Sequence, residues 1–407
     1  MPVFTSSIEV TADYPTIKPS LNLNFARSRA LDPRISFGRT HNSGVVAATY
    51  IGRDGQVKRA GANEPRFDHD YDTLESLGLL IEEGRTNFCG DAIPSVADWT
   101  KLNNGTISFG FPAPDGTNTA CRYVGSSTAP ASLLRVGLPA FTTGTDVYTV
   151  SFWVKQVVAN TQTGQNLVCD LHDGGPSVNY SDQLVQDKWV RVVQTGTTTS
   201  GTKTFFDMIS NTLNNGTYDF WGLQIEQGDF ATSLILTTDS TIGTRGPDEG
   251  NITGSVFSSF FNTTEGVIQT EFSRIGSVNN QMVVQFKDSD GSERIEIRGQ
   301  GSSADSFRIE VIEGGATSSQ EYGFQSSAVV ANVVGQFAKV NLAYKQNDFA
   351  STINGTIAST DTSGDVGVCD RVGIGYANYG GRYNGHIKNI IYYPKRLTNA
   401  QLQLLTA

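Results

Sequence analysis

The sequence predicts an all-β protein, built as two antiparallel β-sandwiches preceded by an extended N-terminal arm. Gly is abundant, at 43 of 407 residues, and Gly, Ser, Thr and Asn fill the spaces between short apolar runs. Many runs alternate apolar and polar residues, the period of a half-buried strand. Charged residues are sparse at 17%, and the stretches typical of helical bundles are nearly absent. The length suffices for two or three domains, each with its own core.

The chain opens with a segment that predicts no regular structure. Residues 1–19 contain prolines and scattered β-branched residues without an amphipathic repeat, so we expect an extended arm that becomes ordered against a partner. Residues 20–25 alternate strictly and predict the first strand. Residues 45–51 are β-branched and aromatic, and the turn at Arg53–Gln56 predicts a following strand from Val57.

A longer strand series follows and carries three of the four tryptophans. The expected strands are residues 78–81, 107–111, 147–155, 188–193 and 217–226. Pro114–Thr117 predicts a turn after the second of these strands. Trp153, Trp189 and Trp221 fall in the last three strands, and we expect them in a shared core because strand aromatics are mostly packed. The alternative is an exposed aromatic platform for carbohydrate.

A polar, turn-rich stretch at residues 237–254 predicts a domain boundary. The expected domains are therefore residues 20–248 and residues 251–407. The second domain repeats the strand pattern, at residues 266–272, 281–286, 294–298, 306–312, 338–344, 351–357, 372–375 and 385–393. Near the C-terminus, Thr398 followed three residues later by Gln401 predicts a capped helix.

Charge and cysteine usage exclude several classes of partner. The formal net charge is -10, which disfavours nucleic acid and anionic membrane surfaces. No apolar stretch approaches the ~18 residues of a membrane span, and the N-terminus lacks the features of a secretory signal. Cys89, Cys121, Cys169 and Cys369 are too widely spaced for a zinc motif. A Cys89–Cys121 disulfide would require an oxidising compartment, so we expect free, buried thiols.

No motif for catalysis or cofactor binding is present, and we expect a non-enzymatic protein with no cofactor and no metal site. The sequence has no G-x-S-x-G string and no G-x-x-x-x-G-K-[ST] phosphate loop. Asp68, Asp70 and Asp72 could collect Ca²⁺, but a salt-bridged turn explains them better. Asp288 and Asp290 precede a Gly at hairpin spacing, and an Asp-Gly turn explains them fully.

One Gly-rich loop combines the residue types of a sugar site. The candidate ligand contacts are Tyr376, Asn378, Tyr379, Arg382 and Tyr383. Aromatic rings stack on pyranose faces, and amide or charged groups bond sugar hydroxyls. The alternative is that these tyrosines pack the loop down or form a subunit contact, since Tyr is enriched at both kinds of interface.

Two sets of motifs resemble known families. Residues 63–70, 79–82, 85–87 and 221–226 resemble, in order and spacing, the lectin/glucanase-like sandwich module of tailed-bacteriophage virion proteins. Residues 251–407 are similar to a concanavalin A-like jelly roll of the laminin-G and pentraxin type. Asn354-Gly355 and the tail from Gly385 to Thr398 carry that second similarity.

These resemblances imply two jelly-roll domains in a non-enzymatic virion structural protein, such as a capsid decoration or a tail or neck fibre component. They imply virion partners (major capsid, tail or neck proteins), homo-oligomerisation, with a trimer as one form, and contact with cell-surface glycans. A receptor-binding lectin and a polysaccharide depolymerase are the alternatives. Relatives bind Ca²⁺ at loop carboxylates, which makes Asp361, Asp365 and Asp370 candidates. The charged residues of the first module are expected to form a structural network: Arg66, Asp68, Asp70, Glu82 and Arg85.

Overall fold

The computed structural model shows an all-β chain of several antiparallel sheets with two short α-helices among its described residues. It describes residues 15–42, 45–128, 130, 132–163, 165–171, 175–276, 281–299, 306–314, 321–329, 335–377 and 381–407. The chain divides into two compact units. Unit 1 comprises residues up to 37, 77–82 and 248–407, and unit 2 comprises residues 38–76 and 83–247.

The domain limits differ from the expected 1–19, 20–248 and 251–407. A division does fall at residue 248, but two earlier segments belong with the C-terminal one. Strand β1 (Leu21–Asn24) pairs with β30 (Gly385–Tyr393), and Leu80 pairs with His386 on the same strand. An alternating pattern reveals a strand and its buried face but not its hydrogen-bonding partner, so the sequence could not assign these segments.

Unit 2 is a sandwich with an additional layer. One sheet has the strand order β15 (Trp189–Thr197), β12 (Val147–Val158), β17 (Thr217–Gln227), β10 (Ala120–Val124) and β9 (Thr106–Phe111). The other has the order β14 (Ser177–Asn179), β13 (Val168–Leu171), β16 (Gly201–Thr212), β11 (Ser132–Thr143) and β8 (Trp99–Leu102). Their facing side chains form the main core, in which Phe152, Phe206 and Phe220 are fully buried.

A three-stranded sheet contributes a second core in unit 2. Its order is β18 (Ile235–Thr237), β3 (Val45–Ile51) and β4 (Val57–Ala60). Trp153 and Trp221 are buried in this cluster, and Trp189 packs against it half-buried. The expected shared tryptophan core is therefore confirmed, with Trp189 at its margin. The remaining elements of unit 2 are β5 (Phe67–His69), β7 (Arg85–Asn87), β19 (Gly243–Arg245) and a short 3-10 helix, Ser181–Gln183.

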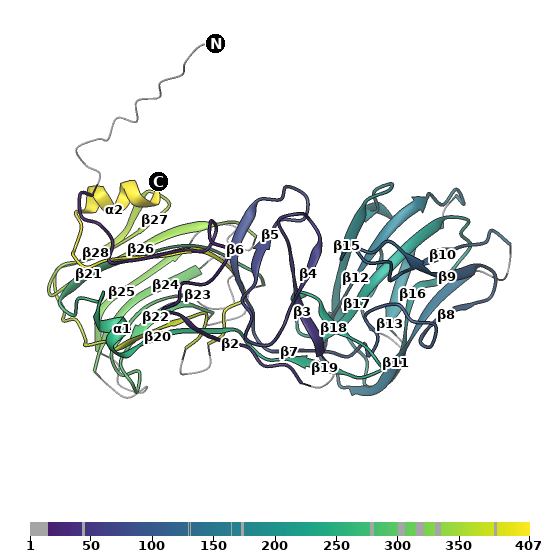
Figure 1. Cartoon of the computed structure of the whole chain (residues 1–407), viewed down its shortest axis with the longest axis horizontal. Coiled ribbons are helices and arrows are strands. Elements are labelled where there is room, and N and C mark those ends of the chain that lie inside the picture. The colour runs from purple at the N-terminus through teal and green to yellow at the C-terminus, as the bar shows by residue number, and fades with distance from the viewer. Residues whose placement is uncertain are drawn as a thin grey trace, which may run out of the picture. The chain divides into compact units, whose positions relative to one another are not determined.

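Unit 1 pairs two larger sheets (Figure 1). One runs β28 (Thr356–Asp361), β27 (Phe349–Ile353), β26 (Ala338–Lys345), β21 (Glu265–Arg274), β30 and β6 (Ser76–Ile81). The seven-stranded sheet runs β2 (Ser36–Gly38), β20 (Glu249–Thr253), β29 (Arg371–Ile374), β22 (Met282–Lys287), β23 (Arg294–Gly299), β24 (Ser306–Glu313) and β25 (Glu321–Val329). Helix α1 (Gly254–Ser258) buries Phe257 beside Phe286 of β22.

The C-terminal helix forms as the sequence predicts. Helix α2 (Asn399–Thr406) carries the expected capping box between Thr398 and Gln401. Leu402 and Leu405 bury its apolar face against β21 and β26. Neither α-helix of the described chain is long and apolar enough to cross a membrane.

Three further sequence expectations have clear outcomes. Residues 351–357 form a hairpin rather than one continuous strand, because the chain turns at Asn354 and Gly355, the pair that carries the jelly-roll similarity; their φ angles are 45° and 79°. Residues 1–14 of the expected arm lie outside the described residues, while Ile17 packs against the cluster beneath α2. All four cysteines are free and buried as predicted, and burial raises the pKa of the Cys169 thiol to about 12.

Candidate functional site

A single row of polar side chains crosses the seven-stranded sheet. Directly paired residues of neighbouring strands point to the same face, so the register places these side chains together. We call this set the polar row: Asn251, Gly373, Gln285, Glu296, Glu310 and Gln325. The neighbours of Glu296 on its own strand, Ile295 and Ile297, are fully buried on the opposite, core face. The sheet therefore has one apolar face in the core and one polar face, on which Gln285, Glu296 and Glu310 are themselves buried.

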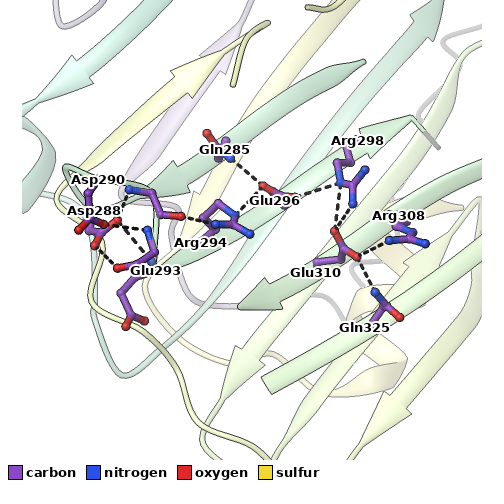
Figure 2. A network of polar contacts seen from close by, with 12 residues as sticks. Gln285, Asp288, Asp290, Glu293, Arg294, Glu296, Arg298, Arg308, Glu310 and Gln325 are labelled. Atoms are coloured by element: carbon purple, nitrogen blue, oxygen red, sulfur yellow. Dashed lines mark hydrogen bonds and ion pairs between the residues drawn. The ribbon is translucent and has the colours of Figure 1, made fainter. Parts of the chain in front are cut away.

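From Gln285 to Gln325 the polar row is linked by hydrogen bonds through Arg298 (Figure 2). Gln285 Nε2 donates to Glu296 Oε2 over 2.7 Å. Arg298 lies between the two glutamates, and its Nε donates to Glu296 Oε1 and to Glu310 Oε2 over 3.0 Å each. Arg308 and Gln325 donate to the other oxygen of Glu310 over 3.4 and 2.6 Å. Both carboxylates are thus held by fixed donors.

The two glutamates of the polar row are buried. Glu296 is 1% exposed and Glu310 is fully buried. Burial raises the pKa of Glu296, and the Gln285 hydrogen bond and the Arg298 charge oppose that shift. Glu296 Oε1 and Glu310 Oε2 both accept from Arg298 Nε over 3.0 Å. The separation of these two oxygens is therefore at most the sum of the two bonds. A retaining glycosidase also uses two nearby carboxylates, but here arginines bond both of them.

Tyr376 extends the polar row at the position where the row has no side chain. A Cβ at Gly373 would come within 3.2 Å of the Tyr376 ring, so Gly373 lets the ring lie across β29. The Tyr376 hydroxyl donates to the Asn251 side chain. Its ring centroid lies 5.1 Å from Lys287 Nζ and 5.6 Å from the Arg382 guanidinium carbon, and half-burial raises the pKa of Tyr376.

The structure brings together only part of the predicted Gly-rich loop site. Tyr376 and Arg382 pair across an isolated β-bridge, and Asn378 and Tyr379 lie outside the described residues. Tyr383 does not join them: it is fully buried, and its hydroxyl donates to the Ser273 backbone oxygen over 2.6 Å. The expectation for Tyr383 is therefore wrong, because its ring packs beneath the loop.

Sequence reasoning missed the polar row itself. The signal was present in residues 294–298, where charged residues alternate with isoleucines. That alternation predicts a strand with a fully charged face. It does not show that Gln285 and Glu310, from other strands, lie directly beside Glu296.

The expected structural network of unit 2 is built around buried Arg66. Its Nη1 donates to the Thr49 backbone oxygen over 3.1 Å and to Ser233 Oγ over 2.5 Å. Asp68 accepts from the Ile51 backbone N–H over 2.6 Å. Both side chains therefore fix the β3 strand from inside the unit, and neither is exposed for a ligand.

The other expected network residues have separate roles. Asp70 caps a turn, accepting from the Thr73 N–H over 2.7 Å. Arg85 Nε donates to Glu83 over 2.5 Å. Glu82 lies in unit 1, where its backbone N–H donates to Asp248 Oδ2 over 2.9 Å.

Two of the aspartates considered for calcium serve turns. Asp288 accepts from the Gly291 N–H over 2.7 Å and from Ser292 Oγ over 2.9 Å, which closes the β22–β23 hairpin. Asp361 likewise accepts from the Ser363 N–H over 2.9 Å. Among the residues that the structure describes, no three or more His, Cys, Asp or Glu side chains gather as a metal site.

A carboxylate pair in unit 2 predicts a pH effect on stability. Burial, with Asp98 as its neighbour, raises the pKa of Asp91 to about 6. Because the pKa of Asp91 is higher in the folded than in the unfolded chain, its protonation stabilises the fold at low pH. That stabilisation is lost as the pH rises through 6. Asp91→Asn is therefore expected to raise Tm at pH 7.5 by about 2–4 °C and to change it less at pH 4.5. Calorimetry measures Tm at both pH values, with the exposed Asp182→Asn as the control. Equal Tm shifts of Asp91→Asn at pH 7.5 and pH 4.5 would contradict the prediction.

A separate cavity of about 580 Å³ lies at the end of β20 and β29, with α1 on one side. Its lining combines Phe257 and Phe261 with Asp370 and Arg371. Arg371 Nε donates to Asp370 Oδ1 over 2.6 Å. Cys369 also lines the cavity, but burial and the neighbouring carboxylates raise the pKa of its thiol, so it is not an activated nucleophile. We therefore take the polar row with Tyr376 as the candidate site.

The chain matches no family model and no curated protein. Solved structures resemble part of it. Domain 4 of AbnA, a GH43 extracellular arabinanase from Geobacillus stearothermophilus in complex with arabinotriose, is 13% identical, with 40% of this chain and 73% of that chain covered and a TM-score of 0.32. The CBM40 of Ruminococcus gnavus IT-sialidase bound to α2,3-sialyllactose is 12% identical, with 36% and 84% covered and a TM-score of 0.31. A heptameric SAP-like pentraxin from Limulus polyphemus is 12% identical, with 36% and 70% covered and a TM-score of 0.29.

Proposed function

We propose that this chain is a non-enzymatic virion component of a tailed bacteriophage, and that unit 1 binds glycans at the half-buried Tyr376, beside the polar row. The virion assignment rests on the sequence motifs shared with phage lectin/glucanase-like modules. A capsid decoration or a tail or neck fibre component, assembled as a homo-oligomer with other virion proteins, fits those motifs. Immunogold labelling of virions with an antibody to this chain tests the location, and virions without label would contradict it.

The glycan-binding assignment rests on one observation, the position of Tyr376. Its half-buried ring lies over Gly373, beside a row of amide and carboxylate groups whose positions are fixed by hydrogen bonds. A flat ring with polar groups at its edge matches a pyranose, which has apolar C–H faces and hydroxyls at its rim. Because the ring and the polar groups are already held in place, ligand binding would cost the site little conformational entropy.

Replacement of Tyr376 by Ala is expected to weaken glycan binding by about tenfold or more, the loss typical of an aromatic hot spot. Tyr376→Phe keeps the ring and removes only the bond to Asn251, so it should bind nearly as well as the wild type. A glycan array followed by calorimetry on the best ligand measures both variants. Binding that survives Tyr376→Ala unchanged would remove Tyr376 from the site.

One observation favours a second function, a polysaccharide depolymerase. The paired Glu296 and Glu310 have the residue types of a glycosidase, and the pKa of Glu296 is raised as in a general acid. Three contacts from Arg298 and Arg308 to Glu310 argue against it, because a carboxylate bonded in this way is not free to act as a nucleophile. Release of reducing sugar from host polysaccharide, lost in Glu296→Gln, would establish the enzyme instead.

A further inference from the structure

A second row on the same face of the seven-stranded sheet consists of cations. Arg371 of β29 pairs directly with Lys287 of β22, and Lys287 pairs directly with Arg294 of β23. We call these three residues the cationic row. Like charges directly opposite one another on neighbouring strands are destabilising. The chain as a whole carries a net charge of -10, so this local positive cluster is not a consequence of composition.

Lys287 is the member whose charge is least compensated. Arg371 has an ion pair with Asp370 over 2.6 Å, and Arg294 has one with Glu296 over 3.5 Å. Lys287 is only 4% exposed, and no carboxylate of the described chain lies within ion-pair distance of it. Its recorded polar contact is the Tyr376 ring. Burial, first, and the Arg371 charge lower the pKa of Lys287, and the charges of Glu296 and Asp288 oppose that shift only in part.

A buried cation between two arginines reduces stability unless an anion compensates it. The position beside Tyr376 indicates what kind of anion fits. An isolated carboxylate or phosphate would meet the cations alone, whereas a sugar that carries a carboxylate can contact the ring and the cations together. The two features lie within one ligand's reach, since Lys287 Nζ is 5.1 Å from the ring centroid.

We infer that the glycans bound at Tyr376 are acidic, and that the cationic row of Arg371, Lys287 and Arg294 receives a sugar carboxylate. This inference rests on the glycan-binding function proposed above. It adds a chemical class, the uronic or other carboxylated sugars, to the site. Affinity is therefore expected to fall as salt rises, chiefly through the part-exposed Arg371, because exposed charges are screened more than buried ones such as Lys287.

The test compares a tetrasaccharide of galacturonic acid with its carboxyl-reduced counterpart, a pair that differs only in the carboxylates. For the full chain, we expect calorimetry to show about tenfold tighter binding of the acidic form, the difference typical of a charged hydrogen bond. Lys287→Met should remove that preference and leave the reduced form unaffected. Lys388→Met, which removes the same charge from β30 on the other sheet, is the matched control and should keep the preference.

Stability separates a ligand-binding role from a merely structural one. Because Lys287 is buried and forms no ion pair with a described residue, Lys287→Met is expected to raise Tm while it weakens acidic binding. A lower Tm of Lys287→Met with unchanged acidic binding would overturn the inference. Equal binding of the two tetrasaccharides would also overturn it, as would an oligoglutamate that binds as tightly as the acidic tetrasaccharide. If both tetrasaccharides bind equally and Tyr376→Ala abolishes both, the glycan-binding function survives and only the acidic preference fails. If no glycan on the array or in calorimetry binds, the proposed function itself fails.

Discussion

Glu310→Ala is expected to destabilise unit 1 by about 3–5 kcal/mol, the loss typical of a broken buried ion pair. Glu310 is fully buried, and its oxygens accept from Arg298, Arg308 and Gln325. Its removal leaves Arg298 with Glu296 as its remaining carboxylate partner. The substitution also leaves a cavity beneath the polar row, and a cavity adds to the loss.

Hydrogen exchange in β23 and β24 measures this effect on unit 1 separately from unit 2, because exchange reports the local opening free energy. Glu271→Ala is the matched control. Glu271 forms a partly exposed pair with Lys388 over 3.4 Å, for which a loss of at most about 1 kcal/mol is expected. Equal losses for the two variants would show that the polar row does not stabilise the sheet.

Trp221→Ala is expected to destabilise unit 2 by a similar amount, about 3–5 kcal/mol, as large-to-small core changes do. Trp221 is fully buried in the core beneath β3 and β4, and its indole N–H donates to Thr119 Oγ1 over 3.0 Å. The substitution therefore removes apolar burial and leaves a hydroxyl without its donor.

Exchange in β12 and β17 measures the loss, with Trp189→Ala as the comparison. Trp189 is half-buried at the margin of the same cluster, so its truncation should have a clearly smaller effect. If Trp189→Ala were as damaging as Trp221→Ala, the core would not be centred where the structure places it.

The sequence predicted strands well wherever the alternation was regular. Residues 147–155 and 217–226 form β12 and β17, and the Thr398–Gln401 capping box forms as expected. Strands β11 and β16 were missed although they pair along most of their length. Register shifts at Ser132 to Arg135 and around Pro139 interrupt their alternation, and a bulge moves side chains from one face to the other.

The candidate site was predicted only in part for a similar reason. Composition alone identified Tyr376 and Arg382, because a Gly-rich loop with tyrosines is unusual. The polar and cationic rows depend on register between strands far apart in the sequence, such as Lys287 beside Arg371. A pattern within one strand shows which side chains share a face but not which residues of other strands lie beside them.

Hydrogen exchange of the whole chain, with and without the acidic tetrasaccharide, tests the binding site most directly. If the glycan binds at Tyr376 and the two rows, exchange should slow in peptides from residues 281–299 and 371–377. Peptides of unit 2 should exchange as before. Slowed exchange confined to unit 2, or unchanged exchange in those two segments at a saturating ligand concentration, would contradict the proposed site.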